Sequence, residues 1–256
     1  MFKFSLFIAA LFSTYAIAAP SPQNLLAASD AIRNPGQPFS LTSTLIEYRN
    51  GKQTDTTTLA VYARADTHSG QFRNLIRFVT PQRDTGKMLL KNGNDLWFYD
   101  PASKASIRIS PQQRLLGQAA NGDVVTVNLA LDYDATLVGN EAIQDGEQQM
   151  RSATLLKLSA KTPDVTYHRI DYWIDSSTNQ PIKAKFYSAS DRLLKTAYYR
   201  RFQQQLGALR PSETVIIDGL DPQWVTVMRS SELAFRDIPE SWLQRDFLPR
   251  FNPEQK

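Results

Sequence analysis

The chain of 256 residues contains no cysteine. This excludes disulfide bonds, although a secreted protein would be free to form them. It also means that the mature start cannot be acylated on a cysteine, so we expect that the product is not itself a lipoprotein. The fold must therefore be stabilised by its apolar core, which a chain of this length can supply.

Catalytic and metal-binding patterns are also lacking. The two histidines, His68 and His168, lie in a predicted turn and a predicted strand, without an HExxH pattern or clustered ligand spacing. There is no G-x-S-x-G elbow, and the glycines fall at turns rather than in a phosphate-binding pattern. Asp132 and Asp134 share a strand face, but without a partner acid they are more typical of a solvated edge. We expect no catalytic residue, metal or cofactor, and hence no enzyme.

Positive charge is in small excess, with a formal net charge of +4. The basic residues are dispersed, and the densest cluster is the pair Arg200-Arg201. No polybasic tract argues for nucleic acid binding. This charge is compatible with a weak attraction to an anionic lipid or an acidic partner, including transient contact with a membrane surface.

One apolar run differs from the rest of the chain. Residues 1–18 contain a single cation, Lys3, then apolar residues from Phe4 onward and the small-residue triplet Ala16-Ile17-Ala18. This pattern predicts a secretory signal peptide cleaved after Ala18. The alternative is a retained anchor, for which the run is shorter than the ~20 residues that a membrane span needs. We expect residues 19–256 to form one domain in a bacterial periplasm.

Three helical segments are predicted, over residues 21–34, 112–120 and 237–251. The first has a candidate N-cap at Ser21 and ends at Asn34-Pro35-Gly36. The second ends at Asn121-Gly122. The third is predicted to pack back onto the body of the protein.

Alternating apolar and polar residues predict antiparallel strands over most of the remaining chain. Residues 39–49 and 56–66 flank Asn50-Gly51, and a second hairpin is centred on Asn92-Gly93. Asn-Gly is the strongest short-range hairpin signal. About eleven strands joined by short turns result. This order excludes a βαβ repeat and favours a mainly β fold with one large curved antiparallel sheet, either a barrel or a half-open one.

Several strands carry apolar bulk on both faces. Trp97, Phe98 and Tyr99 are consecutive, so their side chains alternate between faces, whereas an ordinary antiparallel sheet has one dry face. Helices that cover part of the second face would explain this, and scattered surface aromatics are normal. The sharper hypothesis is a concave face that encloses an apolar cavity for a greasy ligand, with the short helices as a lid. The two explanations are compatible, because a helix that covers an apolar face can also move away from it.

The cavity hypothesis predicts two sets of residues. The candidates for contact with a ligand are Ile76, Phe78, Leu90, Trp97, Tyr99, Trp173, Phe186 and Tyr198. The candidates for the lid are Leu25, Leu26, Leu115 and Leu116.

A series of short motifs points to a known family. A strand ending at Pro81 is followed by Gly86 and Leu89-Leu90, then by Trp97-Phe98-Tyr99-Asp100-Pro101 and Arg108-Ile109. In this order the motifs resemble the LolA-like outer-membrane lipoprotein-sorting family, in its broader branch. The layout of the later half also matches, so the resemblance spans nearly all of residues 19–256.

The resemblance implies an unclosed (half) β-barrel of about eleven antiparallel strands, with two or three short helices over its concave face. It also implies a periplasmic carrier of lipid-modified protein or another acyl-bearing lipid. Such a carrier moves its cargo toward the outer membrane, from an inner-membrane exporter to an outer-membrane acceptor. The segment NGDVVTVNLALDY, residues 121–133, departs from the branch's pattern and leaves the cargo open.

Two other hypotheses remain beside the carrier. A non-enzymatic adaptor of an envelope transporter or assembly complex would dock through a sheet edge or through surface aromatics. An unrecognised envelope enzyme is the third, and no residues support it.

The signal-peptide prediction is tested directly at the N-terminus. We expect protein purified from the periplasm of an expressing bacterium to begin at Ala19, because signal peptidase cuts after a small-residue triplet. Intact-mass measurement and N-terminal sequencing check this. Retention of residues 1–18 in membrane-associated material would support the anchor instead.

Overall fold

The computed structural model describes residues 20–254, so the predicted signal peptide, residues 1–18, lies outside the described residues. The helices are α1 (Pro22–Arg33) and α2 (Leu129–Asp132), with 3-10 turns η1 (Gln82–Asp84), η2 (Asn121–Asp123), η3 (Glu240–Leu243) and η4 (Arg245–Arg250). The strands are β1 (Phe39–Arg49), β2 (Lys52–Ala65), β3 (Phe72–Thr80), β4 (Met88–Asn92), β5 (Asp95–Asp100), β6 (Ala105–Arg108), β7 (Arg114–Leu116), β8 (Ala119–Ala120), β9 (Tyr133–Gln144), β10 (Met150–Ala160), β11 (Arg169–Asp175), β12 (Pro181–Tyr187), β13 (Leu193–Gln205), β14 (Ala208–Asp218) and β15 (Trp224–Phe235).

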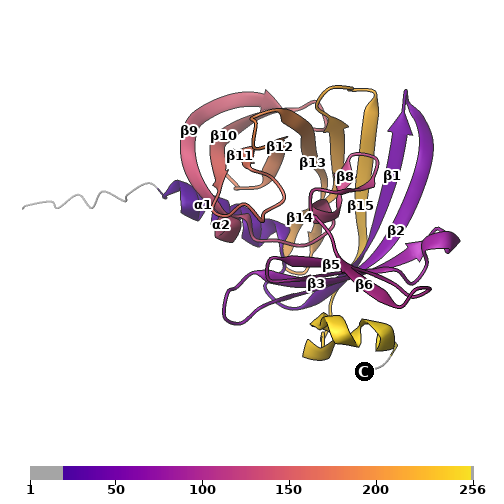
Figure 1. Ribbon diagram of the computed structural model, residues 1–256. Coiled ribbons are helices and arrows are strands. Elements are labelled where there is room, and N and C mark those ends of the chain that lie inside the picture. Colours follow the sequence, from indigo (N-terminus) through magenta and orange to yellow (C-terminus); the bar gives the residue numbers. More distant parts are fainter. Residues whose placement is uncertain (1–19, 255–256) are drawn as a thin grey trace, which may run out of the picture.

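Thirteen strands form one antiparallel sheet in the order β6-β5-β4-β3-β2-β1-β15-β14-β13-β12-β11-β10-β9 (Figure 1). It consists of two meanders that meet where β1 pairs with β15, and β6 and β9 are its free edges, so the barrel is unclosed as the resemblance implied. The expected number of about eleven strands is corrected to thirteen in this sheet.

The predicted Asn-Gly hairpin is confirmed between β1 and β2. Asn50 and Gly51 both have positive φ, at 49° and 74°, which the two-residue turn requires. The turn fixes the register, in which Leu45 pairs with Thr57 and Phe39 with Ala63. The second hairpin forms between β4 and β5 as predicted, but its two turn residues are Gly93 and Asn94 rather than Asn92 and Gly93, because Asn92 pairs with Asp95.

The sheet curls around one apolar cluster, which we call the inner cluster. Leu59 from β2, Leu96 from β5, Leu156 from β10 and Ile174 from β11 all belong to it. Strands this far apart in the sheet order share a cluster only if the sheet bends back on itself. Leu26 of α1 completes the cluster and is fully buried, so this helix covers the concave face.

The outer face of β2 to β5 carries a second apolar cluster. Tyr62, Leu75 and Tyr99 lie there, and the C-terminal segment with η3 and η4 covers them with Trp242 and other side chains (Figure 1). Period-two alternation places neighbouring residues such as Leu75 and Ile76 in different clusters. Apolar bulk on both faces of these strands therefore reflects two packed layers, one inside the curl and one beneath the C-terminal segment.

The helix predicted over residues 21–34 is confirmed. Ser21 caps it, because its hydroxyl accepts a hydrogen bond from the Asn24 amide at 3.2 Å, and Pro22 occupies the first helical position. The Asn34 amide then closes the last turn onto the Asp30 carbonyl at 2.8 Å.

The helix predicted over residues 112–120 is wrong. This segment forms the small β7–β8 hairpin, which turns at Gly117 with φ at +53°. A Cβ on Gly117 would lie 2.3 Å from the Thr226 hydroxyl, so the chain passes very close to β15 here. The Gln118 amide donates to that hydroxyl at 2.8 Å, which binds the hairpin to the sheet in a way that a helix could not.

Removing the Trp242 ring is expected to destabilise the protein strongly. Trp242 is 4% exposed and packs edge-on against Tyr62 and Phe251, with ring centroids 5.4 and 4.8 Å away. We expect Trp242→Ala to lower the free energy of unfolding by ~3–5 kcal/mol, the usual cost of deleting a buried tryptophan. Denaturant unfolding measures it. Phe235→Ala, at a half-exposed residue, is the control and should cost about 0.5 kcal/mol or less.

Candidate functional site: an apolar cavity and its plug segment

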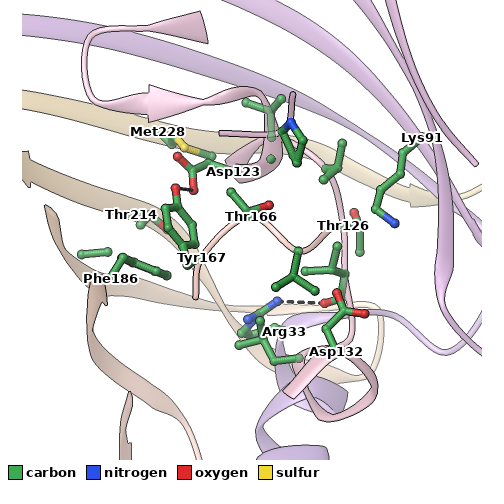
Figure 2. Close-up of a pocket in the computed structure, with 18 of the residues that line it drawn as sticks. Arg33, Lys91, Asp123, Thr126, Asp132, Thr166, Tyr167, Phe186, Thr214 and Met228 are labelled. Carbon is green, nitrogen blue, oxygen red and sulfur yellow. Dashed lines mark hydrogen bonds between the residues drawn. The ribbon is translucent and has the colours of Figure 1, made fainter. Parts of the chain in front are cut away.

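A cavity of about 250 Å³ lies inside the curl, between the sheet and the segments that cross its mouth (Figure 2). Its apolar wall comes from strands of both meanders, and includes Val61, Leu96, Ile170, Phe186, Ile216 and Met228. Shape and lining suit it to an apolar ligand, because buried apolar surface with a few polar groups is typical of ligand sites. Its volume is below the ~300–1,000 Å³ that drug-sized ligands occupy.

Residues 121–132 cross the mouth of the cavity, and we call them the plug segment. They comprise η2, an extended stretch and α2. Val124, Val125 and Leu129 of this segment are buried in the inner cluster and also line the cavity. The protein's own valines and leucine therefore cover apolar surface that a ligand would cover.

Side chains from β3 and from the residue just before it hold the plug segment through its backbone. Buried Asn74 of β3 accepts from the Thr126 amide and donates to the Thr126 carbonyl, both at 2.9 Å. The Gln71 side chain likewise accepts from the Asn128 backbone amide at 2.8 Å and donates to the Asn128 carbonyl at 3.1 Å. Each amide side chain thus imitates a neighbouring strand and satisfies backbone groups that would otherwise be unpaired.

The end of α1 holds the middle of the plug segment. The side-chain amide of Asn34 and the guanidinium of Arg33 donate to the Val127 carbonyl at 2.9 and 3.1 Å. Arg33 lines the cavity (Figure 2). Burial opposes its charge, but the Tyr172 and Asp30 side chains more than compensate, so the pKa of Arg33 is raised above its usual value.

A buried polar network fixes the first turn of the plug segment. Asp123 forms an ion pair with Lys195 of β13 and accepts a hydrogen bond from the Tyr167 hydroxyl at 2.7 Å. The Tyr133 hydroxyl in turn donates to the Tyr167 carbonyl at 3.0 Å. Asp123 also accepts from the Ala120 amide, so one carboxylate joins the hairpin, the plug segment and the sheet.

Burial dominates the titration of this network. It lowers the pKa of the Lys195 ammonium, while the Asp123 carboxylate acts in the opposite direction. It raises the pKa of the Tyr167 hydroxyl well above the usual value, and Asp123 adds to that rise. Charge is therefore costly here, and the ion pair needs both partners.

A second loop, residues 161–168, packs against the plug segment. Thr166 approaches Gly122 so closely that a Cβ on Gly122 would lie 2.1 Å from the threonine hydroxyl. Both Thr166 and Tyr167 line the cavity (Figure 2). Glycine at 122 is therefore required for the two segments to close the mouth together.

Three of the eight predicted contact residues lie on the cavity side. Phe186 lines the cavity, and Ile76 and Phe78 belong to the inner cluster around it. The prediction is wrong for the other five, which lie on the outer face: Leu90, Trp97, Tyr99, Trp173 and Tyr198. The alternation was read correctly, but one strand alone does not reveal which of its faces the sheet curls around.

All four predicted lid residues pack at the inner cluster, two of them from the expected helix α1 and two from a hairpin in place of the expected helix. Leu26 is a fully buried part of the inner cluster, and Leu25 packs against that cluster. Leu115 and Leu116 also pack against it, but from the β7–β8 hairpin rather than from a helix. The plug segment was not predicted as a cover, although its departure from the family pattern marked it as unusual.

The described residues contain no group of three or more His, Asp or Glu side chains placed to hold a metal ion. Between Pro22 and Arg250, none of the helices is long and apolar enough to cross a membrane. The hydrogen bonds described around the cavity hold the segments that cover it.

A solved structure, LolA superfamily protein NE2245 from Nitrosomonas europaea, matches the chain with 31% sequence identity and a TM-score of 0.80. The match covers 90% of this chain and 100% of that one. This chain belongs to the LolA superfamily. A family model described as an uncharacterized protein matches residues 70–250, while no curated protein matches.

Two more distant structures share the fold of this LolA superfamily member. A DUF1329 family protein from Desulfovibrio piger has 21% identity and a TM-score of 0.75, over 90% of this chain and 100% of that one. An outer membrane lipoprotein-sorting protein domain from Vibrio parahaemolyticus has 19% identity and a TM-score of 0.74, over 90% and 98%. The unclosed curved sheet therefore persists at low sequence identity.

The buried ion pair predicts a double-mutant result. We expect Lys195→Met to lower the free energy of unfolding by ~3–5 kcal/mol, because it leaves the Asp123 carboxylate buried and unpaired. Asp123→Asn combined with Lys195→Met should recover part of that loss, since no uncompensated charge remains. Denaturant unfolding of both variants tests this. A double variant less stable than Lys195→Met would contradict the assignment of the cost to unpaired charge.

Proposed function

We propose that this LolA superfamily member is a periplasmic carrier that binds acyl chains of a lipid or a lipid-modified protein in the cavity. The observation that carries the proposal is an apolar cavity inside the curl that is covered by the protein's own apolar side chains. Kinship with a LolA superfamily protein supports it, as does a shared fold with a lipoprotein-sorting domain. The cargo would travel toward the outer membrane, between an inner-membrane donor and an outer-membrane acceptor.

The size of the cavity implies that the plug segment moves when cargo enters. About 250 Å³ is too small for a large acylated ligand, so the valines and leucine of residues 121–132 would have to give way. Each methylene that enters gains ~0.8 kcal/mol of burial. That gain has to exceed the loss of the Asn74 and Gln71 hydrogen bonds, whose groups can be rehydrated at the mouth.

The same competition would allow release. When the cavity empties, Val124, Val125 and Leu129 return to the inner cluster and keep its surface dry. A ligand shifts the equilibrium between the covered and open states only by its differential affinity for the open state. A carrier built this way holds its cargo less tightly than a permanently open cavity would, which suits transfer to an acceptor.

An adaptor role is the second candidate, and the free edge of the sheet favours it. Among the strands of residues 20–254, β9 pairs with β10 alone, and it exposes Leu137 and Val138, which are 55% and 59% accessible. Unpaired strand edges are templates for added strands from a partner. Co-purification with an envelope transporter or assembly complex, lost on Leu137→Lys but unaffected by cavity variants, would favour this role.

Filling the cavity should abolish acyl binding. Thr214 of β14 lines the cavity, whereas its neighbour Val215 is on the opposite face of the strand (Figure 2). We expect Thr214→Trp to weaken binding of cis-parinaric acid, a fluorescent fatty acid, at least ~tenfold, because the indole occupies the ligand's volume. Fluorescence titration measures it.

The matched control is Val215→Trp, which adds the same ring to the outer face and should leave the affinity unchanged. Thermal unfolding of both variants establishes that they remain folded. The carrier proposal fails if the parent protein takes up no acyl probe, or if Thr214→Trp binds the probe as well as the parent does.

A further inference from the structure

A second pocket, of about 490 Å³, adjoins the acyl cavity. It is bounded by the end of β1, the β7–β8 hairpin, the start of β13 and the start of β15, and exposed Leu220 lies at its rim. Its polar lining differs from the acyl cavity, and the residues used below are Arg49, Arg114, Gln118, Arg192, Lys195 and Trp224.

Three guanidinium groups line this pocket. The guanidinium carbons of Arg49 and Arg114 lie 3.1 and 4.1 Å from the centroid of the Trp224 ring, so two like charges share one aromatic side chain. Arg49 is paired with Glu47 at 3.3 Å and Asp221 at 3.6 Å. For Arg114, as for Arg192 at the opposite side of the pocket, residues 20–254 provide no ion-pair partner.

The carboxylates in the pocket are already engaged. Asp218 accepts hydrogen bonds from the Leu220 and Asp221 amides, both at 2.8 Å, and so closes the turn before β15. Asp221 accepts from the Gln223 amide at 3.0 Å and also pairs with Arg49. Neither carboxylate forms an ion pair with Arg114 or Arg192, so the four guanidinium and ammonium groups of the lining outnumber its two carboxylates.

Gln118, a residue of the pocket lining, has a side-chain donor that is buried and unpartnered among residues 20–254. The residue is 8% exposed, and its side-chain Nε2 has no hydrogen-bond partner. Its backbone is fixed on both sides, because its amide donates to Thr226 and its carbonyl accepts from Lys195 Nζ at 3.1 Å. A buried donor without a partner is costly, which is a reason to expect an acceptor in the bound state.

The pocket and the acyl cavity share a wall. Lys195 and Tyr167 line both, and their network with Asp123 separates the two spaces. Displacing the plug segment would carry the Asp123 carboxylate away from Lys195, which already lines the pocket, and so remove a negative charge from beside it. The opening that admits acyl chains would therefore also raise the positive charge next to them.

We propose that this pocket binds a phosphate group, and that it is the headgroup site for a phosphate-bearing lipid whose acyl chains occupy the adjoining cavity. Guanidinium forks match the oxygens of phosphate in pairs, and such charge-assisted bonds are stronger than neutral ones. On binding, the Gln118 side chain would have to turn its Nε2 toward the phosphate to donate to a third oxygen. The headgroup part of this proposal rests on the proposed carrier function, whereas the phosphate site itself does not.

Calorimetric titration with three probes tests the proposal: inorganic phosphate, dihexanoyl phosphatidylglycerol and the uncharged dihexanoylglycerol. We expect the parent protein to bind the phosphatidylglycerol at least ~tenfold more tightly than the dihexanoylglycerol. Arg114→Gln combined with Arg192→Gln should abolish that preference and leave the affinity for dihexanoylglycerol unchanged. Arg83→Gln is the control, since this arginine is 69% exposed and outside both pockets, and it should behave as the parent does.

Each result decides between the two proposals. Equal binding of both lipids by the parent overturns the headgroup site and leaves the carrier intact. Phosphate binding that the double variant loses, with neither lipid bound, supports the phosphate site and overturns the carrier. A charge preference that survives in the double variant, or that Arg83→Gln also loses, shows that the preference arises elsewhere and overturns the assignment to this pocket.

Discussion

Everything in this fold follows from the need to keep the concave face of a wide sheet dry. The side chains of the thirteen antiparallel strands do not fill the space inside the curl by themselves, since residues from other segments also belong to the inner cluster. The chain covers the remainder with α1 and with the plug segment. Covering by separate segments, rather than by strand side chains alone, leaves a boundary at which the interior can open.

Polar contacts give that boundary its position. Asn74 and Gln71, at the start of β3, and Asn34, at the end of α1, hold the backbone of the plug segment, and the Lys195–Asp123 pair anchors its first turn. Burial of the segment's apolar side chains is favourable in many orientations, whereas these hydrogen bonds specify one arrangement of its backbone. Rearrangement at the mouth would therefore involve a small set of bonds and leave the strand ladder intact.

Local signals in the sequence predicted the parts of the fold that depend on near neighbours. The Ser21 cap and the Asn-Gly hairpin after β1 involve residues a few positions apart, and they were predicted correctly. The helix expected over residues 112–120 failed because Gly117 approaches Thr226, more than a hundred positions away. The plug segment was missed for the same reason, since its partners Asn74 and Lys195 are remote in sequence. Likewise, alternation divided Trp97 from Phe98 but did not reveal that the C-terminal segment covers the Trp97 side.

The pairing of β1 with β15 has a consequence for how the protein is made. Strand β1, the first in the sequence, pairs on one side with β2 and on the other with β15, the last in the sequence, where Phe39 lies opposite Phe235. Joining two strands so distant in sequence is slow, since the long chain segment between them must be ordered first. A nascent chain emerging from the ribosome would hold two unjoined meanders until its final strand appeared. The seam of the sheet can therefore close only after the last strand has been synthesised.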